Sequence, residues 1–387
     1  MKSMGKFKDI ALLSLSLSLT TLISMNVVLP SHIADLGGDI ALIGLVYSLR
    51  SVVRSIARLL SGLGSNFFGK KYLILVGLLV RALAFFTIFS ATNILMVAIG
   101  MTIIACSEGL IEPVFLSSAA DIFADTSMAA TAFGIAFTIR RSPTVIAPTL
   151  TGYIADQMGA QNVFLIATLF AVIGFIISLK IEIKNVNANT GKISFRQVGG
   201  IVNKPFLMLL VASIFLFTAV SSMSPILSYW VVDELNYSYT ILGMILTTGA
   251  FIGIFSRVYI GYLSDRIGHV NTLMLVGLVR LVSTLLLIFA RDPVSIAFTR
   301  FLWSAVMAAP PRNALIASLC KRDSYALAYS IVGIAIDIGR ILGPGIVGYI
   351  ISLYGFNWGF ITISMSLTAF ILTLLILRRS LIGYVKD

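Results

Sequence analysis

Long apolar segments separated by short polar connections run along the whole chain. A transmembrane helix needs roughly 20 predominantly apolar residues to cross a hydrocarbon core about 30 Å thick. Hydropathy along the sequence predicts such helices at residues 10–31, 41–64, 71–91, 94–118, 129–152, 161–180, 206–230, 240–263, 271–290, 294–318, 325–350 and 357–378. The pattern therefore predicts an all-α polytopic membrane protein with twelve transmembrane helices.

One connection is much longer than the others. Residues 181–204 form a polar stretch between the sixth and seventh predicted helices, at the midpoint of the 387-residue chain. We therefore predict an N-terminal six-helix bundle at residues 1–180, a cytoplasmic linker at 181–204 and a C-terminal six-helix bundle at 205–387. The two termini and the linker are expected to be too short for a soluble domain.

The two halves repeat each other at a nearly constant offset. Pairs 199 positions apart are Gly44 and Gly243, Arg58 and Arg257, Gly62 and Gly261, Gly69 and Gly268, and Arg81 and Arg280. Pairs 196 positions apart are Ala132 and Ala328, Pro148 and Pro344, Gly152 and Gly348, Tyr153 and Tyr349, Gly159 and Gly355, and Phe164 and Phe360. A parallel repeat of six helices predicts two pseudo-symmetric bundles with a binding site at their interface.

Composition leads to the same class. Hydrophobic residues make up 58% of the chain and charged residues 11%, whereas a soluble domain carries roughly 25% charged residues. This excludes a single soluble globule. One cysteine, Cys106, lies in an apolar helix, and the other, Cys320, lies just beyond one. Because the two histidines, His32 and His269, fall in predicted loops, we predict no metal site and no cofactor.

Basic residues concentrate in one set of loops, which predicts the orientation. Sixteen of the 28 basic residues lie in the termini and in alternate loops: Lys2, Lys6, Lys8, Lys70, Lys71, Lys180, Lys184, Lys192, Arg196, Lys204, Arg266, Lys321, Arg322, Arg378, Arg379 and Lys386. The opposite loops hold only Arg291. The positive-inside rule then places both termini in the cytoplasm of a cell-membrane protein. This placement explains much of the net charge of +12 without a nucleic-acid partner.

The turn after the eighth predicted helix carries a recognisable motif. Residues 261–269 read GYLSDRIGH, which resembles the G-x-L-x-D-R-x-G-[RK] signature of the major facilitator superfamily. The first half has a degenerate copy at residues 62–71, with Asn66 at the acidic position and Phe67 at the arginine position. The resemblance covers the whole chain through its helix number, its repeat and its central linker.

This resemblance implies a transporter whose two bundles rock around a central cavity lined by helices 1, 4, 7 and 10. It implies gating roles for Gly62, Asn66, Gly69, Gly261, Asp265, Arg266 and Gly268, and we add Arg58 and Arg257 as cytoplasmic latches. In the family the acidic residue meets a neighbouring helix N-terminus and helps to close the cytoplasmic side. We therefore expect Asp265 to contribute more to this closure than Asn66. The family's antiporter motif is matched only at Pro148 and Gly152, which gives little support for export.

Arginines outnumber acids in the predicted helices. The eleven arginines are Arg50, Arg54, Arg58, Arg81, Arg140, Arg141, Arg257, Arg280, Arg300, Arg312 and Arg340. A charge at mid-membrane costs at least about 2.5–3.5 kcal/mol, so such side chains face a cavity, a partner or the interface. We predict that Arg50, Arg54, Arg141 and Arg312 line the substrate cavity, and that Arg81, Arg280 and Arg300 have structural roles. The positive excess favours an anionic or carboxylate-bearing substrate.

Three acids lie in the predicted transmembrane helices, and they are the candidates for proton coupling. Glu108 and Glu112 lie one turn apart on the fourth predicted helix, and two close carboxylates tend to share one proton. The alternative is that each glutamate neutralises an arginine. We expect Asp337 to pair either with Arg340 or with the arginines of the second helix. The ion pair would be either a gate that breaks during rocking or a permanent buried pair.

We therefore predict a monomeric, proton-coupled secondary transporter of a small molecule in a lipid bilayer, acting by alternating access. One alternative is a proton-driven multidrug exporter of lipophilic cations that uses Glu108 or Glu112. A second is a non-transporting sensor on the same fold. A membrane enzyme is disfavoured, because the sequence contains neither H-E-x-x-H nor G-x-S-x-G.

Overall fold

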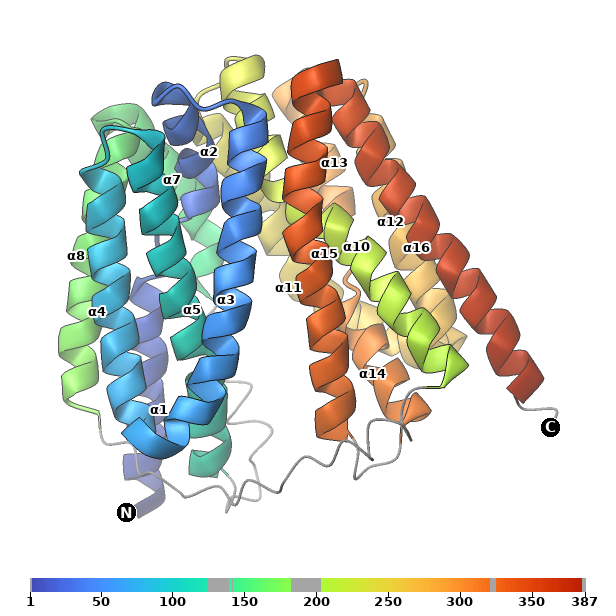
Figure 1. Cartoon of the computed structure of the whole chain (residues 1–387), viewed down its shortest axis with the longest axis horizontal. Coiled ribbons are helices and arrows are strands. Elements are labelled where there is room, and N and C mark those ends of the chain that lie inside the picture. The colour runs from blue at the N-terminus through green and yellow to red at the C-terminus, as the bar shows by residue number, and fades with distance from the viewer. Residues whose placement is uncertain (1, 124–138, 141, 182–202, 321–324, 385–387) are drawn as a thin grey trace. The chain divides into compact units, whose positions relative to one another are not determined.

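The computed structural model describes residues 2–123, 139–140, 142–181, 203–320 and 325–384. The elements in chain order are α1 (Lys2–Leu19), α2 (Met25–Asp35), α3 (Ile40–Phe68), α4 (Lys70–Phe89), α5 (Ile94–Phe123), α7 (Pro143–Met158), α8 (Ala160–Leu179), α10 (Lys204–Tyr229), η1 (Trp230–Glu234), α11 (Tyr239–Ile267), α12 (His269–Leu287), α13 (Pro293–Ser304), α14 (Ala309–Leu319), α15 (Tyr325–Tyr354) and α16 (Phe356–Tyr384). Within these residues every element is a helix, which confirms the all-α class (Figure 1).

Nine helices among the described residues are long and apolar enough to cross a membrane. They coincide with nine of the twelve predicted spans. The first and tenth predicted spans are each divided into two shorter helices, and part of the fifth lies outside the described residues. The expected number of spans thus fits the structure, although two of them are not continuous helices.

The two broken spans correct the prediction of continuous helices at 10–31 and 294–318. In the first span, residues 20–24 separate α1 from α2, and the hydroxyls of Thr20 and Thr21 donate to carbonyls of the preceding turn. Such local bonds compete with helix continuation. The amide of Ser24 donates to the Thr151 hydroxyl of α7 at 2.8 Å, so a distant helix stabilises the break.

The second break has a different local cause. Residues 305–308 separate α13 from α14, and Pro310 and Pro311 lie in the first turn of α14. Proline has no amide donor and its ring clashes with the preceding turn, so it begins a helix more readily than it continues one. The prolines therefore start α14 as a separate helix.

The histidine placement also differs from the prediction of two loops. His32 lies inside α2, where it is buried and its ring centroid is 5.3 Å from that of Phe164. The other histidine, His269, is the first residue of α12. Among the described residues, no group of three or more possible metal ligands was found.

Contacts divide the chain into two compact units. Unit 1 comprises residues 1–38, 49–190 and 236–243, and unit 2 comprises residues 39–48, 191–235 and 244–387. Each unit therefore contains a short segment from the other half of the sequence. The predicted halves at 1–180 and 205–387, joined by 181–204, remain a prediction of domain organisation.

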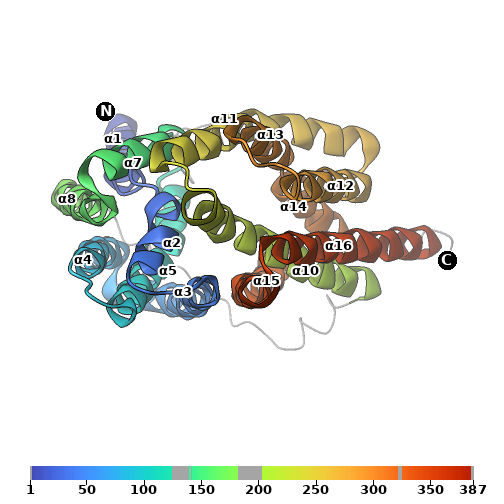
Figure 2. The same cartoon turned by 90° about the horizontal axis from the view of Figure 1, so that it is seen from above.

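Unit 1 is built around α4, which packs against α5 and α8 (Figure 1). Its buried core includes Leu17 of α1, Leu78 of α4 and Phe115 of α5. In unit 2, α10 packs along α15 and α16 (Figure 2). Gly339 and Gly343 of α15 lie directly against the backbone of α10, as small residues do where helices pack closely.

The glycine pairs of the sequence repeat adopt matching backbone conformations. Gly69 and Gly268 precede α4 and α12 with φ of 80° and 88°. Gly159 and Gly355 precede α8 and α16 with φ of 88° and 86°. Side chains rarely tolerate this left-handed region, so the repeat preserves four turns that depend on glycine.

Candidate functional site

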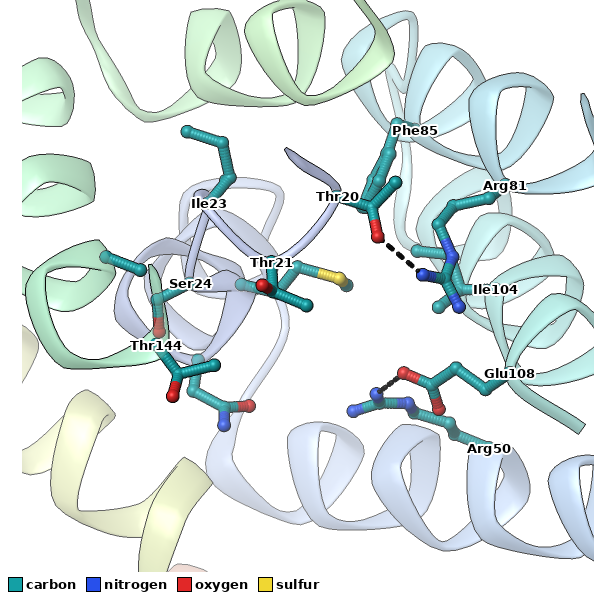
Figure 3. Close-up of a pocket in the computed structure, with 13 residues that line it drawn as sticks. Thr20, Thr21, Ile23, Ser24, Arg50, Arg81, Phe85, Ile104, Glu108 and Thr144 are labelled. Atoms are coloured by element: carbon teal, nitrogen blue, oxygen red, sulfur yellow. Dashed lines mark hydrogen bonds and ion pairs between the residues drawn. The ribbon is translucent and has the colours of Figure 1, made fainter. Parts of the chain in front are cut away.

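A pocket of about 280 Å³ lies in unit 1 at the break between α1 and α2 (Figure 3). It is lined by Thr20, Thr21, Ile23, Ser24, Met25, Asn26, Arg50, Arg81, Phe85, Ile104, Glu108, Thr144 and Ala147. The lining combines hydroxyl groups from the broken helix with charged groups from α3, α4 and α5. Irregular backbone at membrane depth is tolerated where it lines a cavity, and such breaks mark binding sites in transporters.

An ion-pair network forms one wall of this pocket. Arg50 Nη2 lies 2.5 Å from Glu108 Oε1, and Arg54 Nη1 lies 3.8 Å from Glu108 Oε2. The exposed fractions of the three side chains are 17%, 19% and 25%, so water reaches the network only in part. Two predicted cavity arginines and one predicted coupling acid are thus brought together by the fold.

Local sequence explains how α3 and α5 come so close. Arg50 and Arg54 are four residues apart and therefore share one face of α3. Gly109 follows Glu108 on α5, and a Cβ there would lie 2.8 Å from the Arg54 carbonyl and 2.5 Å from the Ala57 side chain. The missing side chain allows Glu108 to reach the arginines.

The next turn repeats the arrangement more loosely. Arg58 Nη2 and Glu112 Oε2 are 3.5 Å apart, with exposed side-chain fractions of 32% and 38%. Each glutamate thus has its own arginine partner, the arrangement expected if the acids neutralise arginines. This geometry also distinguishes the two acids, because Glu108 lines the pocket and the Glu112 carboxylate is more exposed.

Arg81 connects α4 to the break in the first span. Its Nη1 donates to the Thr20 hydroxyl at 2.8 Å and its Nε donates to the Ser107 hydroxyl at 3.0 Å. Ser107 in turn donates to the Gly77 carbonyl. The predicted structural role of Arg81 is therefore combined with a place in the pocket wall (Figure 3).

Unit 2 holds the other predicted charged residues. Arg340 Nη1 is 3.2 Å from Asp337 Oδ1 on the same helix. The guanidinium carbons of Arg312 and Arg340 lie 5.4 Å and 5.1 Å from the centroid of the Phe217 ring. The structure contains the expected pairing of Asp337 with Arg340.

The remaining predicted site residues are found as follows. Arg141 lies outside the described residues, and the side chains of Gly62 and Asn66 are not described either. In the second-half loop motif, Arg266 stacks on Tyr262 at 4.6 Å from the ring centroid, and Ser264 hydrogen-bonds to His269. Asp265, Gly268 and Arg257 are exposed and Gly261 is half-buried. The gating roles of these residues remain predictions.

Sequence reasoning missed the hydroxyl-bearing wall of the pocket. Thr20, Thr21 and Ser24 were inside a span predicted to be continuous, and Thr144 was not considered. A signal was present, since residues 14–24 read SLSLSLTTLIS, with a hydroxyl at more than half of the positions. Such a run weakens a helix and can line a polar cavity.

Comparison with known protein families decides the classification. The profile of the Major Facilitator Superfamily matches residues 11–227 and 209–383. The chain belongs to this superfamily. The resemblance that the motif at residues 261–269 and the internal repeat indicated is therefore confirmed.

Sequence relatives within the superfamily include proteins named for drug resistance. The multidrug resistance protein MdtG of Klebsiella pneumoniae is 29% identical over 251 residues, which cover 62% of this chain and 60% of MdtG. A homolog of the multi-drug resistance efflux pump PmrA from Lactococcus lactis is 25% identical over 57% of each chain. The quinolone resistance protein NorA of Staphylococcus aureus is 23% identical over 71% of each. The matches to the first two thus span less than two thirds of those proteins.

Solved superfamily structures share the fold over almost the whole chain. The nucleoside transporter NupG superposes with a TM-score of 0.79 at 14% identity, covering 97% of this chain and 99% of NupG. The peptide transporter POT in complex with sulfate gives a TM-score of 0.76 at 12% identity, covering 97% and 94%. At these identities the likeness establishes the fold alone.

Proposed function

We propose that this protein is a secondary active transporter of a small organic molecule, coupled to protons through Glu108. The observation that carries the proposal is the ion pair between Glu108 and Arg50 in the wall of a pocket that is lined by a broken helix. Both bundles would rock around the substrate by alternating access, in a cell membrane with the termini in the cytoplasm. The protein would act as a monomer.

The pair suggests how a proton and a substrate are linked. An ionised Glu108 holds Arg50 and, more loosely, Arg54. Protonation removes the negative charge and releases positive charge into the pocket. A carboxylate on the substrate would then take the place of Glu108 beside these arginines. Proton binding and anion binding would favour each other, and this coupling is reciprocal.

The charge of the predicted helices supports an anionic substrate. Ten of the eleven arginines in these helices are among the described residues, and they share the helices with Glu108, Glu112 and Asp337. Buried charges need compensation. A substrate with a carboxylate or another anionic group would supply part of it.

A second candidate function is export of lipophilic cations by proton antiport. The drug-resistance names of MdtG, PmrA and NorA favour it. In this case the cation would bind the Glu108 carboxylate in competition with the proton. The two candidates therefore predict opposite effects of pH on substrate affinity.

The experiment is a titration of purified protein with amphipathic carboxylates and lipophilic cations at several pH values. An anionic substrate should bind more tightly as the pH falls, by up to about tenfold per pH unit for one linked proton. A cationic substrate should bind more weakly as the pH falls. Proton-driven uptake or efflux in liposomes would then separate a transporter from a sensor that binds without transport.

The matched variants are Glu108→Gln and Glu112→Gln, one turn apart on α5. In Glu108→Gln the affinity should become independent of pH, because the amide cannot ionise. Glu112→Gln should keep the pH dependence of the wild type. An identical pH dependence in wild type and Glu108→Gln would reject Glu108 as the coupling residue.

A further inference from the structure

The sequence repeat gives the pocket of unit 1 a counterpart in unit 2. At an offset of 199, Arg280 corresponds to Arg81 and Gly249 to Arg50. At the later offset of 196, Ser304 corresponds to Glu108. The structure supports this last pairing, since a Cβ on Gly249 would lie 2.7 Å from the Ser304 hydroxyl. Position 249 thus faces position 304 as Arg50 faces Glu108.

Two arginines occupy this counterpart site. Arg280 Nη2 donates to the Val306 carbonyl at 3.1 Å, in the break between α13 and α14. Its guanidinium carbon lies 5.0 Å from the centroid of the Trp303 ring. Arg300 fills the space beside Gly249, where a Cβ would lie 2.9 Å from Arg300 Nε. Both units therefore place an arginine of the repeat at a break in a membrane helix.

The two sites differ in their negative charge. Within the described parts of the chain, no carboxylate lies within ion-pair distance of Arg280 or Arg300. The Nε atoms of both are buried and have no hydrogen-bond partner among these residues. Charges that are withdrawn from water and have no counter-ion are costly, so a bound anion would stabilise this site.

We propose that Arg280 and Arg300 form a binding site for an oxyanion, with the Ser304 hydroxyl as an additional donor. The ligand group would be a carboxylate or a phosphate, because the planar guanidinium binds either through two parallel hydrogen bonds. Three sources carry such a group, namely a transported molecule, an inorganic ion and a lipid headgroup, and the test below distinguishes them. The inference rests on the charges of unit 2 and is independent of proton coupling at Glu108.

The test measures thermal unfolding of the full-length protein in detergent at constant ionic strength. Sodium benzoate and sodium phosphate are titrated separately, with sodium chloride as the control. Nanodiscs of phosphatidylglycerol or phosphatidylcholine form the lipid arm. We expect a saturable rise in the unfolding midpoint with at least one oxyanion source and none with chloride. The arm that responds identifies the source.

Two variants and one matched control assign the response to this site. Arg300→Gln should weaken the apparent affinity for the oxyanion by about tenfold or more, the loss expected for a charged hydrogen bond. Ser304→Glu places a carboxylate where the repeat has Glu108, so it should raise the midpoint without oxyanion and abolish the response. Arg378→Gln, which neutralises an exposed arginine of α16 outside both sites, should respond like the wild type.

Two results would overturn the proposal: no saturable response to any of the three oxyanion sources, or an unchanged response in Ser304→Glu. If Arg300→Gln does not fold, Ser304→Glu alone decides. Glu108→Gln keeps this test distinct from the proposed function. It should lose the pH dependence of substrate binding and retain the oxyanion response.

Discussion

The charged sites of the two units are built from the same repeat, but the positive charges of their arginines are compensated differently. In unit 1, Arg50 and Arg54 share the Glu108 carboxylate. In unit 2, Arg280 and Arg300 have a carbonyl, an aromatic ring and a hydroxyl nearby, and no carboxylate among the described residues pairs with them.

The difference comes from two exchanges between repeat partners. Where unit 1 has an arginine on α3 and a glutamate on α5, unit 2 has Gly249 and Ser304, and its arginine comes from α13 as Arg300. Unit 1 therefore carries its own counter-ion, and the proposed oxyanion would supply one to unit 2 from outside. The two copies of a duplicated scaffold can thus differ in whether a carboxylate of the protein or an anion from outside balances their arginines.

The strongest test of this comparison neutralises one arginine in each unit. Arg50→Gln should lower the free energy of unfolding by about 1–3 kcal/mol, less than the 3–5 kcal/mol of a fully buried pair because Arg54 remains and the site is partly exposed. Arg300→Gln should raise it by about 1 kcal/mol, because a half-buried charge without a counter-ion is removed. Chemical unfolding in an oxyanion-free buffer measures both.

Opposite signs are the essential feature of this prediction. A loss of stability in both variants would mean that the unit 2 arginines are already compensated within the protein. Arg300→Lys is the control, since it keeps the positive charge and should not increase stability.

A medium effect should come from an asymmetric helix cap. In unit 1, the Asp156 carboxylate accepts hydrogen bonds from the backbone amides of Tyr239 and Thr240, at the start of α11. Their lengths are 2.9 Å and 2.8 Å. The repeat partner of Asp156, Ser352, donates to the Tyr349 carbonyl of its own helix. Asp156→Ala should therefore cost about 1 kcal/mol, as for other N-caps, and Ser352→Ala close to nothing. Thermal unfolding of both variants measures this, and equal losses would contradict it.

The smallest effect concerns two other caps of the repeat. Asp292 accepts the amides of Val294 and Ser295 at the start of α13, and Asn93 accepts the amide of Met96 at the start of α5. Hydrogen bonds from Ser295, then from Val294, hold the pKa of Asp292 below its ordinary value. The cap therefore stabilises the protein above the unfolded pKa of about 3.9, and the stabilisation is lost as the pH falls through the lower folded value.

Unfolding midpoints measured against pH test this difference. In Asp292→Asn, the decrease of the unfolding midpoint that comes from protonation of this cap at low pH should disappear. Asn93→Asp should introduce a decrease of similar size from the corresponding cap in unit 1. A wild-type acid response that persists unchanged in Asp292→Asn would assign it to other carboxylates.

The membrane class and the repeat could be predicted because they depend on patterns that are local or periodic. Apolar length predicted twelve spans, nine of which are continuous helices among the described residues, and the repeat paired Gly69 with Gly268, which adopt matching turn conformations. The breaks at residues 20–24 and 305–308 were not predicted, because both segments are apolar enough to read as continuous. Their stability depends on distant partners such as Thr151 and Arg280.

The sequence by itself determined the helical membrane class, the superfamily motif, the repeat and the set of charged residues placed in apolar segments. These follow from hydropathy and spacing, which act along the chain. Only the tertiary structure decided that Glu108 meets Arg50 and Arg54, that Asp337 meets Arg340, and that residues 39–48 and 236–243 pack with the opposite halves. Ion pairing falls off over a few ångströms, so which charges are compensated depends on how helices cross.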